Sequence, residues 1–290
     1  MIRTSIVIPT FNGVATIREC LDCIRGQSFV DFEAIICDNA STDGTSEICA
    51  EVAAADSRFV HIRNDKTIPA LENFKQGLGL ARAPYFMWRA DDDLTDENHL
   101  RSTVRTLDEN PDVKLAVTKI HRINTTSGRE ADYPLPVSSG KDRLSRATAT
   151  LLGCHPSWFY GLWRREAAVD GLSIVKAYPY LWAFDHLVTM RAMLHGEVAF
   201  VTDSVFIQRI MREGFYHLDP VERLAARKAY VALSRKLIAD TDYSENEKAV
   251  LRGVLEKHAN KRVAPWFKTH KRALRARVAR FFRLVPPTYR

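Results

Sequence analysis

Short apolar segments alternate with segments of helical periodicity over the first 120 residues, and this alternation limits the fold more than any other feature. The apolar runs are nearly continuous, which is typical of strands buried on both faces of a sheet. Between them, apolar residues recur every three or four positions, as they do in amphipathic helices. This order predicts an α/β fold with a mostly parallel sheet flanked by helices. The predicted strands are Ser5–Pro9, Phe32–Asp38, Arg58–Asn64, Pro84–Ala90 and Val113–Lys119.

The rest of the chain is less regular and divides into two parts. Around residues 182–201 the sequence predicts a helix that ends near Gly196 and is followed by a strand, and from Pro220 onward the pattern is helical. A chain of 290 residues can build one large core with an appendage. We therefore expect a main domain at residues 1–215, with halves at 1–120 and 121–215, and a helical C-terminal region at 216–290.

Three polar clusters stand at the ends of predicted strands: PTFN at 9–12, DNASTDGT at 38–45 and ADDDL at 90–94. The carboxyl ends of parallel strands meet at one edge of a sheet, where ligands of such folds bind. The sequence therefore predicts a binding site assembled from these three clusters.

The aspartates Asp91, Asp92 and Asp93 follow the fourth predicted strand directly. Adjacent carboxylates raise one another's pKa unless a cation lies between them. Magnesium and manganese favour a few carboxylates completed by phosphate oxygens, so the triplet indicates a divalent metal and a diphosphate. The alternative is a solvated helix start, because aspartate is a good N-cap and acids suit a helix N-terminus.

Asp38 ends the second predicted strand and begins the cluster DNASTDGT. On its own this segment is typical of an Asx turn that leads into a capped helix. Beside the aspartate triplet, the Asp38 carboxylate would also be able to accept a hydrogen bond from the imide N–H of a nucleobase. Neither a Walker motif nor a GxGxxG after a strand is present, so a metal rather than a glycine-rich loop is expected to hold the phosphates.

The segment IVIPTFNGVATIRECLDCIRGQSFVDFEAIICDNASTDGT resembles the opening of the family-two inverting, nucleotide-sugar-dependent bacterial glycosyltransferases, which have the GT-A fold. An IPTYN-like strand end, an aspartate in a D-N-x-S-x-D-G-T pattern and a D-x-D-type cluster recur there in this order. The resemblance covers residues 4–120 well and 150–215 loosely. It implies that residues 1–120 bind the nucleotide-sugar and that residues 121–215 bind the acceptor. It also implies a role in the assembly of bacterial surface polysaccharide or glycolipid.

The resemblance also implies roles for individual residues. Asp91 and Asp93 would hold manganese or magnesium, although Ala90 stands at the first position of the common D-x-D-D form, which leaves open which two aspartates act as the pair. The residues that would line the nucleotide-sugar site are Pro9, Thr10, Asn12, Asp38, Asn64, Asn73, Asp91 and Asp92.

A catalytic carboxylate is implied at the start of a later helix, where Asp185 fits the pattern. An inverting transfer needs one general base to take the proton of the acceptor hydroxyl. The alternative for Asp185 is an acid that only stabilises a helix N-terminus. His217 would be a further metal ligand, a diphosphate contact or an ordinary surface histidine, and Arg209 and Arg212 would contact phosphate.

Positive charge is concentrated at the C-terminus. Lys257 to Arg290 contains eleven Lys or Arg and no Asp or Glu, so the net charge of +7 leaves −4 for residues 1–256. This distribution argues against a nucleic-acid-binding domain. The apolar residues with helical spacing in the tail are Leu274, Val278, Phe281 and Val285. This spacing predicts an amphipathic helix that lies on an anionic membrane or, alternatively, one that packs on the body of the protein.

No apolar run reaches 18 residues and no signal peptide is recognisable, so we expect a cytoplasmic protein, peripheral on the inner membrane, with a glycan or lipid-linked acceptor. Two other functions compete. DDDLT matches the DxDx[TV] of haloacid-dehalogenase-type phosphatases, but it follows the fourth strand rather than the first. A non-catalytic membrane-binding protein would leave the acidic clusters unexplained.

Overall fold

The computed structural model describes residues 1–211 and 218–281. These residues form two compact units. The first contains residues 1–135 and 157–173 and the described residues from 197 to 211, and the second contains 136–156, 174–196 and the described residues from 218 on. The boundary expected near residue 215 stays a prediction.

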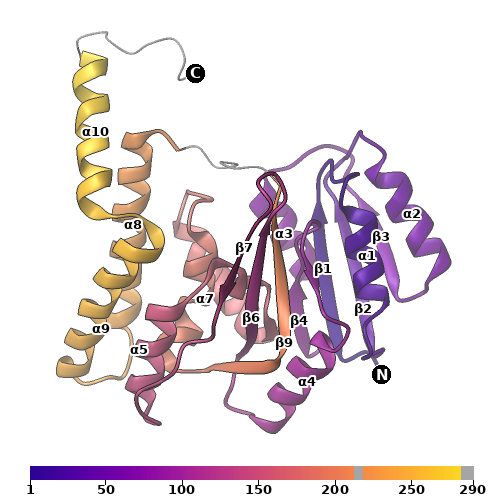
Figure 1. The fold of residues 1–290 in the computed structure, drawn as a ribbon, viewed down its shortest axis with the longest axis horizontal. Helices are drawn as coiled ribbons and strands as arrows, with labels where there is room; N and C mark the ends of the chain where they lie inside the picture. Colours follow the sequence, from indigo (N-terminus) through magenta and orange to yellow (C-terminus); the bar gives the residue numbers. More distant parts are fainter. Residues whose placement is uncertain (212–217, 282–290) are drawn as a thin grey trace. The chain divides into compact units, whose positions relative to one another are not determined.

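The first unit is built on a mixed sheet with strand order β3-β2-β1-β4-β8-β6-β9-β5, and β7 pairs with β6 (Figure 1). Strands β1 to β4 are parallel neighbours, and β6 is parallel to β9. Strands β5, β7 and β8 pair antiparallel with their neighbours. The α/β fold is therefore confirmed, with short antiparallel strands that the sequence pattern did not predict. The strands are β1 (Thr4–Thr10), β2 (Phe32–Asp38), β3 (Phe59–Arg63), β4 (Tyr85–Trp88), β5 (Leu94–Thr95), β6 (Leu115–Asn124), β7 (Arg129–Tyr133), β8 (Leu162–Arg164) and β9 (Val198–Ile210).

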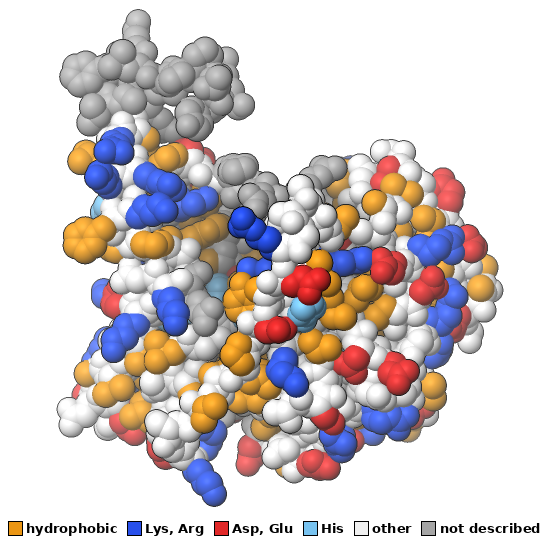
Figure 2. Space-filling view, in the orientation of Figure 1, with side chains coloured by type: hydrophobic (Ala, Val, Ile, Leu, Met, Phe, Trp, Pro, Cys, Tyr) orange, Lys and Arg blue, Asp and Glu red, His pale blue; other side chains and the backbone are white. Residues whose placement is uncertain are grey.

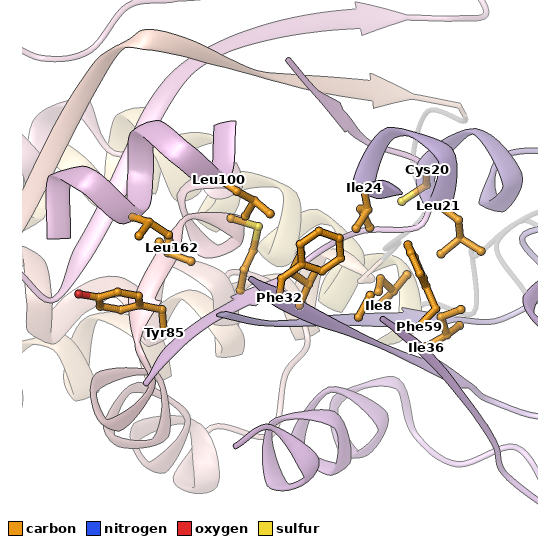
Figure 3. Close-up of a cluster of buried hydrophobic side chains, with 14 of the residues drawn as sticks. Ile8, Cys20, Leu21, Ile24, Phe32, Ile36, Phe59, Tyr85, Leu100 and Leu162 are labelled. Carbon is orange, nitrogen blue, oxygen red and sulfur yellow. The ribbon is translucent and has the colours of Figure 1, made fainter. Parts of the chain in front are cut away.

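Helices cover both faces of the parallel part, because β1 is apolar on both of its faces. Ile6 and Ile8 join the buried cluster that includes Leu21 of α1 (Figure 3). Val7 points to the other face, where a Cβ on Gly77 of α3 would lie 2.2 Å from its Cγ1. Only glycine therefore allows α3 to approach the sheet this closely. The helices that follow these strands are α1 (Ile17–Arg25), α2 (Thr45–Ala55), α3 (Ala70–Leu80), α4 (His99–Glu109) and α6 (Arg165–Ile174).

The second unit is helical. Capping boxes at Asp219 with Glu222, and at Ser244 with Glu247, fix the starts of α8 and α9. The predicted helix before Gly196 is confirmed as α7, and Gly196 ends it with a φ of 68°. The helices of this unit are α5 (Arg143–Gly153), α7 (Phe184–His195), α8 (Pro220–Ala239), α9 (Glu245–His258) and α10 (Trp266–Phe281). Among the described residues, no helix is both long enough and apolar enough to cross a membrane.

Candidate functional site

The end of β1 is joined directly to the aspartate triplet. The hydroxyl of Thr10 donates a hydrogen bond to Oδ2 of Asp91 over 2.5 Å. A Cβ on Gly13 would lie 2.5 Å from the same Oδ2 and 2.9 Å from Thr10 Oγ1, so a side chain at this position would displace the pair. Burial raises the pKa of Asp91 to about 6, although the Thr10 hydrogen bond opposes the rise. The result is a half-buried carboxylate whose negative charge would be stabilised by a cation.

The end of β2 is held by a different set of bonds. Asp38 is fully buried and accepts hydrogen bonds from the backbone N–H of Ser41, at 2.9 Å, and from the hydroxyl of Ser46. The Nε2 of His61 and the Nε of Arg63 lie 3.6 and 3.5 Å from Asp38 Oδ2. Burial by itself raises the pKa of Asp38, but the serine hydrogen bonds and His61 outweigh it and hold the pKa below its usual value. Asp38 therefore stays ionised and fixes the loop at 39–46.

Asn12 connects the two strand ends. Its backbone N–H donates to Ser41 Oγ at 3.0 Å, and its side-chain oxygen accepts from the N–H of Thr42 at 2.8 Å. Asn12 has a φ of 52°, a left-handed conformation that asparagine adopts more readily than most residues. Pro9 is buried in β1 beside these contacts. The predicted residues Pro9, Thr10 and Asn12 thus lie at one edge of the sheet with Asp38.

A network of side-chain amides lies next to the ends of β2 and β3. The side-chain amide of Asn73 donates to the carbonyl of Cys37 at 2.9 Å, and Asn64 donates to the side-chain oxygens of Asn39, at 3.1 Å, and Asn73, at 3.3 Å. Gln76 in turn donates to Asn64 at 3.1 Å. The sequence indicated Asn64 and Asn73 and placed Asn39 in the cluster at 38–45, whereas Gln76 is recognisable only from the folded contacts. Their bonds indicate that this group shapes the loops after β2 and β3.

The other two aspartates face β9. Asp93 is 3% exposed, and its Oδ1 accepts a hydrogen bond from the backbone N–H of Arg209 at 2.8 Å. The Arg209 guanidinium donates to the carbonyl of Asp92 and to the carboxylate of Glu19. Burial raises the pKa of both Asp92 and Asp93, and the charge of Asp92 adds to the rise at Asp93. The role of Arg209 in binding phosphate stays a prediction, since its side chain here joins the triplet to α1.

Behind the triplet lies Arg89, an arginine that sequence reasoning missed. It is 1% exposed and donates to Thr95 Oγ1 at 2.9 Å, with its guanidinium carbon 5.4 Å from the centre of the Phe206 ring. Its positive charge opposes the rise in the pKa of Asp93. An arginine two residues before three aspartates was the available signal, because a buried carboxylate group needs positive charge nearby.

The donor set of the triplet fits a magnesium or manganese ion. All three carboxylates have raised pKa values because burial disfavours their charge, and a cation would reverse that effect. Within the described residues, no group of three or more His, Cys, Asp or Glu side chains is arranged to hold a metal. Magnesium commonly takes only one or two carboxylates and completes its shell with water and phosphate oxygens. The assignment of Asp91 and Asp93 as ligands stays a prediction, and His217 and Arg212 lie outside the described residues.

Asp185 belongs to the second unit, in the first turn of α7. Its Oδ1 accepts the N–H of His186 at 2.7 Å, and Ala183 just before the helix has a φ of 61°. Burial raises the pKa of Asp185 to about 6. Because His186 is itself in the first turn of α7, this bond also suits an acid that stabilises the helix start, so both roles for Asp185 stay predictions.

Comparison with known proteins decides the family. The family model described as Glycosyl transferase family 2 matches residues 5–168, which include the ends of β1, β2 and β4. This protein belongs to glycosyl transferase family 2. Within curated proteins, the chain is 29% identical over 222 residues to the uncharacterized protein Rv1520 of Mycobacterium tuberculosis, covering 76% of this chain and 62% of Rv1520. The chain thus spans about three-fifths of the length of that relative.

Other family relatives match shorter segments. The chain is 24% identical over 127 residues to the glycosyltransferase GlyA of Streptococcus pneumoniae, covering 43% of this chain and 18% of GlyA. Solved structures show the same fold. TarS 1–349 of S. aureus, in complex with UDP-GlcNAc, has a TM-score of 0.71 at 19% identity and covers 90% of this chain and 73% of its own. The mannosyltransferase PcManGT of Pyrobaculum calidifontis, in complex with GDP-Man and Mn²⁺, has a TM-score of 0.60 at 18% identity and covers 96% and 75%. The GT-A fold expected from the sequence is confirmed.

Proposed function

We propose that this protein is a metal-dependent inverting glycosyltransferase, which moves a sugar from a nucleotide-diphosphate-sugar to a hydroxyl acceptor in bacterial surface polysaccharide or glycolipid assembly. One observation carries the proposal. The end of β1 bonds both to the acidic triplet, through Thr10 and Asp91, and to the loop fixed by Asp38, through Asn12 and Ser41. A carboxylate suited to a metal–diphosphate and a loop suited to a base therefore share one sheet edge.

On the donor side, the loop at 39–46 and the amides of Asn64 and Asn73 would frame the nucleoside. Asp38 would accept the base imide N–H at Oδ2 once the Ser46 hydroxyl, which donates to that atom, turns away. Asp91, with Asp92 or Asp93, would hold manganese or magnesium. The bound ion would stabilise the charge that develops on the leaving nucleoside diphosphate. The Mn²⁺ and GDP-Man bound to PcManGT support this part of the proposal.

On the acceptor side, Asp185 would act as the general base. A carboxylate with a pKa of about 6 is ionised at neutral pH and is basic enough to take a proton in the transition state. The acceptor oxygen would attack the anomeric carbon from the face opposite the diphosphate, and its proton would pass to Asp185. This single displacement inverts the configuration at the anomeric carbon and needs no covalent enzyme intermediate.

The acceptor in this proposal is a glycan or a lipid-linked sugar. Nucleic acid is not proposed as a partner. Family membership covers the DDDLT segment at 91–95, so it favours sugar transfer over the phosphatase reading of that segment. A non-catalytic membrane protein would give no reason for the partly buried Thr10–Asp91 pair.

The test is a screen of nucleotide-sugars for manganese-dependent hydrolysis and transfer. We expect release of nucleoside diphosphate from one class of donor, lost in Asp91→Asn and retained in the control Asp112→Asn, which changes an exposed aspartate of a surface turn. Thermal protection by UDP or GDP with Mn²⁺ should follow the same pattern. Protection that is equal in Asp91→Asn and wild type would show that Asp91 does not hold the metal.

A further inference from the structure

The C-terminal helix α10 has an exposed face that is both basic and apolar. Phe267 is 82% exposed, Leu274 is 64% exposed and Trp266 is 43% exposed. Phe267 and Leu274 are seven residues apart, so they lie on one stripe of the helix. Figure 2 shows Lys and Arg side chains interspersed with hydrophobic ones over α10. The exposed basic residues of the helix are Lys268, Lys271, Arg272, Arg275 and Arg277.

The opposite face of α10 is buried within the second unit. Thr269 and Ala273 are 5% and 1% exposed, and α10 packs against α8 within the second unit. Short side chains on that face allow the two helices to approach closely. Burial of this narrow face holds the helix, while the large apolar residues Phe267 and Leu274 are left outside. Packing on the body, the sequence alternative for this helix, therefore accounts for one face only.

Charge identifies what would cover the exposed face. The helix from Trp266 to Phe281 contains no Asp or Glu. Its five exposed basic side chains form no ion pair with any residue that the structure describes. Such a surface complements a layer of negative charge, and the interspersed apolar residues need an apolar phase beneath that charge. Anionic lipid headgroups over acyl chains provide both, whereas a nucleic acid backbone provides only the charge.

We propose that the exposed face of α10 binds anionic lipid and thereby brings the unit that carries Asp185 to an acceptor held in the membrane. Helix α8 packs against both α7 and α10, so one compact unit contains the lipid-binding face and the proposed base. The acceptor class is then a hydroxyl-bearing sugar attached to a lipid. This last step rests on the proposed function, but the lipid-binding face does not.

Sedimentation with vesicles tests the surface without any sugar transfer. The full chain is mixed with vesicles of phosphatidylglycerol and phosphatidylcholine in equal parts, or of phosphatidylcholine alone. Each basic contact near an anionic surface is expected to strengthen binding about fivefold, so Lys271→Glu with Arg275→Glu should weaken binding roughly 25-fold or more. The control Lys141→Glu with Lys236→Glu makes the same charge change at exposed sites of the same unit outside α10 and should bind as wild type.

A second variant separates the apolar from the electrostatic part. Phe267→Ser with Leu274→Ser should weaken binding most at high salt, where the basic contacts are screened. The proposal is overturned if the Lys271/Arg275 variant sediments as wild type, if neutral vesicles bind equally well, or if a short DNA duplex displaces the vesicles at equal charge. Calorimetry with UDP or GDP and Mn²⁺ distinguishes the two proposals. A wild-type protein that binds vesicles but no nucleotide would refute the proposed function. A wild-type protein that binds nucleotide but no vesicles would refute the lipid-binding role of α10.

Discussion

Replacing Asp91 with asparagine should stabilise the metal-free protein. The pKa of Asp91 is raised from 3.8 to about 6 by burial, which means that the folded state bears a cost when this carboxyl is ionised. Asparagine has no charge and still offers an oxygen to the Thr10 hydroxyl. The substitution therefore removes the cost and keeps the hydrogen bond.

The size of the effect follows from the shift. A rise of roughly two pKa units corresponds to about 3 kcal/mol in the free energy of unfolding above pH 6. Asp91 is only partly shielded from solvent, so we expect about 2 kcal/mol, which raises Tm by roughly 4–8 °C. The pKa of Asp91 is higher in the folded state than in the unfolded state, so ionised Asp91 destabilises the fold by the full amount above pH 6. The cost fades as the pH falls toward 4.

Thermal melts in EDTA at pH 8 and at pH 4.5, for wild type and Asp91→Asn, measure this directly. The gain should be present at pH 8 and mostly gone at pH 4.5. Added Mn²⁺ with a nucleoside diphosphate should then stabilise the wild type and leave the variant unchanged. A variant that is less stable than wild type at pH 8 without metal would refute the claim that the buried charge is costly.

Further predictions concern the rest of the site. Gly13→Ala should weaken donor binding, because a Cβ 2.5 Å from Asp91 Oδ2 would displace that carboxylate; an unchanged affinity in titration with UDP or GDP and Mn²⁺ would contradict this. Asp185→Asn should lower transfer at least about 100-fold while nucleotide binding persists, since general-base catalysis contributes roughly that much; lost binding would place Asp185 in the donor site. In the wild type, transfer should fall as the pH drops below about 6, where Asp185 becomes protonated, and a rate that rises in acid would contradict its role as base. Asn73→Ala should cost about 1–3 kcal/mol in urea unfolding, because the Cys37 carbonyl loses its buried partner, and an unchanged midpoint would contradict this.

The parallel part of the fold could be predicted from the sequence because local periodicity encodes it. The strand predicted at Phe32–Asp38 has the same bounds as β2. The short strand β8 could not be predicted, since Leu162–Arg164 is only three residues long and lies in a largely apolar and aromatic segment where strand and buried helix look alike. The return of the chain to the first unit at 157–173 and 197–211 depends on contacts between distant segments, which no local pattern records.

The candidate site shows the same division. The polar clusters at 9–12, 38–45 and 90–94 were predictable, because strand ends in a parallel sheet share an edge. The close approach of Gly13 to Asp91 was not, since a glycine after a strand is equally typical of an ordinary turn. Arg89 was also missed, because its position behind Asp93 depends on β9 and Phe206, which lie more than a hundred residues away. Likewise, Val285 and the side chains of Val278 and Phe281 lie outside the described part of the tail.

A crystal structure of the protein with Mn²⁺ and UDP or GDP tests the central claim most directly. We predict a metal ion coordinated by a carboxylate oxygen of Asp91 and by the diphosphate, with the nucleoside against the loop at 39–46. A diphosphate bound away from the ends of β1, β2 and β4, with Asp91 still bonded only to Thr10, would contradict it.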